Sequence, residues 1–128
     1  MASGSWPTEL RVPAARDSLR VRYEDGTEVV LAAEYLRVFT PSAERVGHGA
    51  RQVIGGKDGV TVTALTPVGR YAVRIHFSDG HDTGIFPLTS LAELAAAHAT
   101  NWRDYERELA LTGLERTRPG TAPAPPRA

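Results

Sequence analysis

Residues 19–32 carry the pattern of a β-hairpin. Leu19–Tyr23 alternates apolar residues with arginine, which is the two-residue period of a strand that buries one face. Asp25-Gly26 follows, and an Asp-Gly pair between two strand-like segments is a strong signal for a tight turn. The return strand is expected over Glu28–Ala32, so the early part of the chain is committed to antiparallel pairing.

Four further segments show strand patterns. A short strand is predicted over Glu9–Val12, ahead of the hairpin, and another over Val60–Leu65. Tyr71–Phe77 is the clearest amphipathic strand, since its apolar residues occupy every second position and one face should be buried. Thr83–Phe86 is expected to be the last strand, and its open edge could pair with a second copy of the chain to form a homo-oligomer.

Helical patterns follow the hairpin and return after the last strand. Ala33–Phe39 has apolar spacing that suits one or two helical turns. Ser90 and Glu93 form a capping-box pattern, which predicts that a helix begins there. Asn101 is expected to cap a second helix, and Gly113 is a good terminating residue for it.

These segments predict one domain of the α+β class. The expected architecture is an antiparallel sheet of about five or six short strands, with a short helix after the first hairpin and one or two C-terminal helices. Residues 1–6 are expected to be a flexible N-terminus, residues 7–114 the single folded domain, and residues 115–128 a disordered Pro/Ala-rich tail. Within the domain, residues 41–58 are expected to form a long glycine-rich loop.

The composition excludes several classes of function. The chain has no cysteine, so disulfides, thiolate nucleophiles and cysteine-bound zinc or iron–sulfur clusters are excluded, and no cofactor is expected. A formal net charge of +0 argues against recognition of nucleic acid or an anionic membrane surface. No apolar segment is long enough to span a membrane and no secretion signal is recognisable, so the cytoplasm is the expected location.

The segment FSDGHDTGIF, residues 77–86, is dense in polar groups that could bind a ligand or metal. His81 and Asp82 are adjacent, so they point to opposite faces of an extended chain, and Asp79-Gly80 could simply close a turn. In the glycine-rich loop, His48 stands between two glycines, and Arg37 could pair with Glu44 or with Asp79. The candidate ligand or partner residues are Arg37, Glu44, His48, Asp79, His81 and Asp82.

Four blocks occur in an order and spacing that resemble a known family. They are LRVRYEDG, EYLRVFTPSAERVGHG, PVGRYAVRIHFSDGHDTGIF and NWRDYERELALTG. With these blocks the chain is similar, from Pro7 to Gly113, to small bacterial proteins of unknown function (DUF971) that are related to the N-terminal domain of γ-butyrobetaine hydroxylase.

The resemblance implies a zinc site that this sequence has lost. In the hydroxylase, a Cys-x-Cys-x-x-Cys run and a later histidine hold a structural zinc. The three thiolate positions fall on Thr40, Ser42 and Arg45 of this chain, and His81 corresponds to the histidine. A closed zinc site needs four good ligands, so this degenerate set is not expected to bind metal.

Three hypotheses about function remain open at this point. The first is a non-catalytic binding or interaction module, accessory to iron–sulfur or other metallocofactor assembly through protein contacts. Its suggested partner is an iron–sulfur carrier ATPase, because related domains occur attached to such ATPases. The second is a small-ligand or metal-binding protein, with or without enzymatic activity, that uses His48, His81 and neighbouring acidic residues. In the third, the FSDGHDTGIF segment serves only as sheet and turn.

Overall fold

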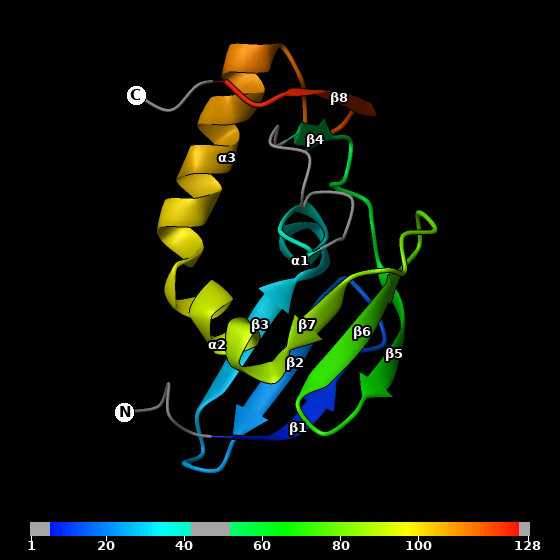
Figure 1. Ribbon diagram of the computed structural model, residues 1–128, viewed down its shortest axis with the longest axis vertical. Helices are drawn as coiled ribbons and strands as arrows, with labels where there is room; N and C mark the ends of the chain where they lie inside the picture. The colour runs from blue at the N-terminus through cyan, green and yellow to red at the C-terminus, as the bar shows by residue number, and fades with distance from the viewer. Residues whose placement is uncertain (1–5, 42–51, 126–128) are drawn as a thin grey trace.

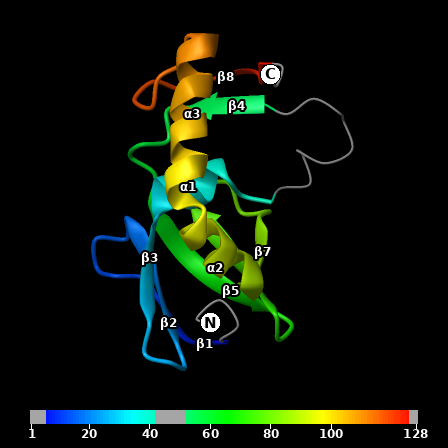
Figure 2. The same cartoon turned by 90° about the vertical axis from the view of Figure 1, so that its left-hand side faces the viewer.

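A computed structural model describes residues 6–41 and 52–125 of the chain (Figure 1). Two three-stranded antiparallel sheets occupy one end of the molecule, and a two-stranded sheet lies at the other end. A short helix, α1 (Ala33–Val38), lies between the two ends, while α2 (Leu88–Ala96) and α3 (His98–Thr112) run along one side (Figures 1 and 2). The predicted α+β class and antiparallel pairing are therefore confirmed, with the strands divided among three small sheets.

The first sheet contains the predicted hairpin. Its strands β1 (Pro7–Arg11), β2 (Ser18–Tyr23) and β3 (Glu28–Ala32) pair in that order, all antiparallel. In β2 the apolar residues at alternate positions are buried, while Arg20 and Arg22 face outward and lie near carboxylates of the neighbouring strands. The two-residue period of the sequence thus corresponds to the burial pattern of the strand.

The second sheet contains β5 (Val62–Val68), β6 (Ala72–Phe77) and β7 (Ile85–Pro87) in the order β5-β6-β7. The inward residues of β6 are buried, as the alternation predicts. Tyr71 differs from the prediction, because the strand begins one residue later and 68% of Tyr71 is exposed. Its ring packs edge-on against Trp6, with the ring centroids 5.5 Å apart.

Helices α2 and α3 both begin before the residues predicted to cap them, Ser90 and Asn101. Helix α2 begins at Leu88, and the Ser90 hydroxyl donates to the backbone carbonyl of Pro87 at 2.7 Å instead of capping an N–H group. Helix α3 begins at His98, so Asn101 lies within its first turn. The reason is that both side chains bond to groups other than the first free amides of a helix. The predicted stop at Gly113 is confirmed, because this residue is the left-handed C-cap of α3.

The third sheet corrects two predictions. Strand β4 (Gln52–Gly55) lies in the segment expected to be a long loop, and β8 (Gly120–Pro123) lies in the tail expected to be disordered. The two strands pair antiparallel over all four residues. Backbone hydrogen bonds hold this pair, so the scarcity of large apolar side chains in the tail, which suggested disorder, does not prevent strand formation.

Two clusters of buried side chains form the core. The larger cluster lies between the two three-stranded sheets, α1 and α2. The smaller cluster contains Val38, Val53, Tyr105 and Leu109, and so joins α1 and α3 to β4. Phe39 and Trp102 pack against both clusters and so connect them.

Candidate functional site

Asp79 is the centre of a partly buried charge cluster. It lies in the turn after β6, and one carboxylate oxygen, Oδ2, accepts a hydrogen bond from Arg37 Nε at 2.8 Å and another from Lys57 Nζ at 2.5 Å. The other oxygen, Oδ1, accepts from the backbone N–H of His81 at 3.1 Å, which closes the turn. The predicted alternative of an Arg37–Asp79 pair is therefore present in the structure.

The pKa of Asp79 reflects these contacts. Burial by itself would raise the pKa of the carboxyl group. The hydrogen bonds from Lys57, the His81 amide and Arg37, together with the charge of Arg37, outweigh burial and lower the pKa to about 2. Asp79 therefore stays ionised near neutral pH, with its lone pairs directed to groups of the protein itself.

The remaining candidate residues fall into two groups. His81 is half-buried beside Phe77, and Asp82 is exposed. Glu44 and His48 lie outside the described residues, so the predicted meeting of His48 with His81 and the predicted Arg37–Glu44 pair stay predictions. In residues 6–41 and 52–125, no three potential ligands gather in a way that could hold a metal ion.

Only one of the three positions that resemblance assigns to the zinc thiolates is described. Thr40 is almost fully buried, with 1% of the residue exposed. It lies so close to Gly84 that a Cβ atom at position 84 would overlap the threonine side chain. Positions 42 and 45 lie outside the described residues, and the loss of the zinc site stays a prediction from the sequence.

Lys57 was not among the sequence candidates, although it donates a hydrogen bond to the Asp79 carboxylate, as Arg37 does. It is the single lysine of the chain and follows two glycines, but no phosphate-binding motif surrounds it. Asp79 lies more than twenty residues further along the chain, and only the turn after β6 brings the two side chains together. The sequence carries no local signal for such a contact.

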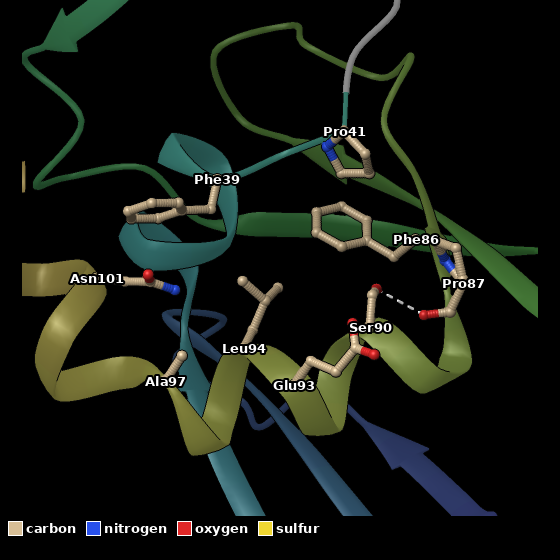
Figure 3. Close-up of a pocket in the computed structure, with 9 residues that line it drawn as sticks. All are labelled: Phe39, Pro41, Phe86, Pro87, Ser90, Glu93, Leu94, Ala97 and Asn101. Carbon is tan, nitrogen blue, oxygen red and sulfur yellow. Dashed lines mark hydrogen bonds between the residues drawn. The ribbon is translucent and has the colours of Figure 1, made fainter. Parts of the chain in front are cut away.

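A pocket with mostly apolar walls lies apart from this cluster, at the meeting point of four elements (Figure 3). Its volume is about 400 Å³, which is within the range of sites that bind small molecules or large side chains. One wall comes from the residues after α1, the opposite wall from β7, and the floor from α2 and the start of α3. The lining residues are Phe39, Pro41, Phe86, Pro87, Ser90, Glu93, Leu94, Ala97 and Asn101.

The orientation of the Asn101 amide at one end of the pocket is determined by a short hydrogen-bond chain. The Tyr35 hydroxyl donates to the backbone carbonyl of Leu94 at 2.6 Å. Having one proton, this hydroxyl can only accept from Asn101 Nδ2, which lies 2.9 Å away. The amide nitrogen is therefore directed at Tyr35 and uses one of its two hydrogens there, so the Asn101 amide can still both donate and accept at this end of the pocket.

At the other end of the pocket, Glu93 and Ser90 lie side by side (Figure 3). The Ser90 proton is engaged by Pro87 O, so the hydroxyl offers only lone pairs to a ligand. Glu93 is exposed, is the single charged residue of the lining, and forms no ion pair within the described part of the chain. The pocket thus combines apolar walls with hydrogen-bond acceptors at both ends.

None of the sequence candidates lines this pocket. Its apolar residues follow the same periodic patterns as the core, so the sequence does not distinguish a side chain that faces a cavity from one that fills the interior.

Within the described ranges, no helix is both long enough and apolar enough to cross a membrane.

Comparisons with known proteins agree with the fold and leave the site without an assigned role. A family model described as "Gamma-butyrobetaine hydroxylase-like, N-terminal" matches residues 10–92. No curated protein matches the chain.

Three solved structures are similar over most of this chain. Two are solution structures determined by NMR, 39% and 36% identical to this chain, each with a TM-score of 0.76. Each match covers 88% of this chain, and 90% and 85% of the respective other chain. The third is a crystal structure of a DUF971-family protein of unknown function from Acidithiobacillus ferrooxidans. It is 41% identical with a TM-score of 0.59, and the match covers 71% of this chain and 93% of that chain.

Proposed function

The chain belongs to the gamma-butyrobetaine hydroxylase-like N-terminal family, and from this premise we propose that it is a non-catalytic interaction module of the cytoplasm. In this role the domain binds another protein and holds it in place, and any chemistry belongs to the partner. The proposed setting is the assembly of iron–sulfur or other metallocofactors, with an iron–sulfur carrier ATPase as the proposed partner. The support for this setting is that the four sequence blocks described above resemble a family whose related domains occur attached to such ATPases.

The pocket between α1, β7, α2 and α3 is the observation that carries the proposal. Protein interfaces concentrate their binding energy in a few large side chains that fill desolvated pockets on the partner. A pocket of about 400 Å³ with aromatic and aliphatic walls can receive one or two such side chains. The Asp79 cluster supports a structural role for the turn, because its carboxylate oxygens are engaged by the protein's own donors.

The test compares what the protein captures from its native cells when the pocket is open and when it is filled. Ala97→Phe places a ring in the pocket, while Ala99→Phe adds the same ring at an exposed position of α3 and serves as the control. We expect quantitative mass spectrometry to find a partner held equally by wild type and Ala99→Phe, and lost with Ala97→Phe.

Glu93→Arg provides a second pocket variant that cannot disturb the core, because Glu93 is exposed. We expect it to lose the same partner. If the set of captured proteins is identical for all four forms of the protein, the pocket is not an interaction site and the proposal fails.

A further inference from the structure

The chemistry of the pocket specifies the kind of segment that would occupy it. We infer that the pocket receives a partner segment in which a large apolar side chain is adjacent to an arginine or lysine. This inference rests on the proposed function, since it names the chemistry of the partner at the same site. The argument uses the walls, the two ends and the charge of the pocket in turn.

The walls require an apolar anchor. The half-buried side chains of Phe39, Leu94 and Ala97 line the pocket, while Phe86 lies at its inner side and is fully buried (Figure 3). A large apolar side chain that enters the pocket leaves water and contacts these apolar walls, and the gain grows with the apolar area that it buries. Tryptophan and tyrosine are the side chains most enriched among such interface anchors.

The end of the pocket formed by Ser90 and Glu93 requires a hydrogen-bond donor on the ligand. The single hydroxyl proton of Ser90 is donated to Pro87 O, so Ser90 presents only acceptor lone pairs, whereas Asn101 uses one amide hydrogen on Tyr35 and keeps the other. The Glu93 carboxylate, like Ser90, only accepts. A ligand group that is itself only an acceptor would leave the Ser90 and Glu93 oxygens unpaired, whereas an ammonium or guanidinium group satisfies them.

Charge complementarity places the cation at the rim. Glu93 is the single charged lining residue, and no basic side chain in the described ranges lies within ion-pair distance of it. Because Glu93 is exposed, its partner must lie outside the apolar interior, next to the anchor. A polypeptide offers this arrangement directly, since neighbouring residues of a segment can send one side chain inward and keep the other at the surface. A free amine with an apolar body is the competing source of the same chemistry.

The test uses end-blocked tetrapeptides and NMR amide shifts of the full chain. The probes are Gly-Trp-Arg-Gly and Gly-Arg-Trp-Gly, with Gly-Trp-Glu-Gly, Gly-Ala-Arg-Gly and phenethylammonium chloride for comparison. We expect at least one Trp/Arg peptide to shift the amides of Leu94 and Ala97, and to bind about two- to five-fold more tightly than Gly-Trp-Glu-Gly, which is the ratio typical of an exposed ion pair. Gly-Ala-Arg-Gly should not shift these amides.

Two variants separate the contributions. In Glu93→Gln the difference between the Arg and Glu peptides should disappear while the tryptophan anchor still binds. In Ala97→Phe no peptide should bind, and in Ala99→Phe all should bind as they do to the wild type; the amide spectra themselves report whether each variant is folded.

Three results would overturn the inference. Equal binding of the Arg and Glu peptides to the wild type would show that the anchor is recognised without the cation. Tighter binding of phenethylammonium than of either Trp/Arg peptide would assign the pocket to a small amine. Absence of any pocket shift would reject the motif altogether. The capture experiment with Ala97→Phe does not depend on this motif, so the proposed function would be judged separately.

Discussion

Replacing Asp79 by asparagine removes one negative charge from a cluster that holds three parts of the chain together. The carboxylate joins the turn after β6 to Arg37 on α1 and to Lys57 in the segment after β4. Asparagine has nearly the same shape and keeps one acceptor oxygen, so the substitution tests the charge more than the packing. Both cations remain largely buried, with 11% and 19% of their side chains exposed.

The expected loss follows from the pKa of the carboxyl group. In the folded protein this pKa is about 2, below the value of 3.8 for a free aspartate. Each unit of such a difference corresponds to about 1.4 kcal/mol, so the ionised carboxylate contributes on the order of 2 kcal/mol to the free energy of unfolding. Because the folded pKa is the lower one, this stabilisation is complete above roughly pH 4 and is lost as the pH falls through about 2.

The assay is urea-induced unfolding of wild type and Asp79→Asn at a series of pH values from neutral to strongly acidic. We expect the variant to be less stable by about 2 kcal/mol at neutral pH. The gap should narrow below roughly pH 4, where the carboxyl group of the unfolded wild-type chain takes up a proton, and close near the folded pKa of about 2. Asp82→Asn is the matched control, since this exposed carboxylate makes no ion pair among the described residues and should change stability by less than about 0.5 kcal/mol. A gap between wild type and Asp79→Asn that does not change with pH would refute the reasoning.

Three further substitutions test contacts elsewhere in the fold, each measured by chemical denaturation. Gly84→Ala should cost about 1 to 3 kcal/mol because the new methyl group overlaps Thr40, and adding Thr40→Ala should recover part of that loss. Gly56→Ala should cost at least about 1 kcal/mol, since position 56 has a φ of +76° and lies against the backbone before β8, whereas Gly59→Ala enters open space and should be nearly neutral. Arg116→Ala should cost about 2 kcal/mol, because Arg116 donates two hydrogen bonds to the nearly buried carboxylate of Glu34 on α1. An unchanged denaturation midpoint would show that this contact does not hold the C-terminal segment.

Local chemistry explains which parts of the fold could be predicted. The hairpin of β2 and β3, the buried face of β6 and the stop at Gly113 all depend on residues within a few positions of one another. Strands β4 and β8 were missed because each has only four residues and a partner in a distant part of the sequence. No period in a single sequence reports such a pairing.

The contacts of the candidate site were likewise predicted only where the sequence carries a local signal for them. The Arg37–Asp79 contact was one of two predicted alternatives, because an arginine at the end of a helix and an acidic turn are both visible in the sequence. Lys57 was missed because nothing near it in the sequence indicates a carboxylate partner. The pocket was missed because its large apolar residues belong to the core or pack against it, and no pattern in the sequence marks which of them also line a cavity.

The pairing of β4 with β8 has a consequence for the order in which the molecule can be assembled. During synthesis the residues of the larger buried cluster, which extend to Leu91 on α2, are all made well before β8. The two three-stranded sheets can therefore close around α1 while β4 still lacks its partner. Strand β8 has no fully buried residue, and segments with few buried contacts open first, so amide protons of β4 and β8 should exchange with solvent faster than those of β2 and β6. The β4–β8 end of the molecule would then act as a separate, weaker unfolding unit beside a stable sheet core.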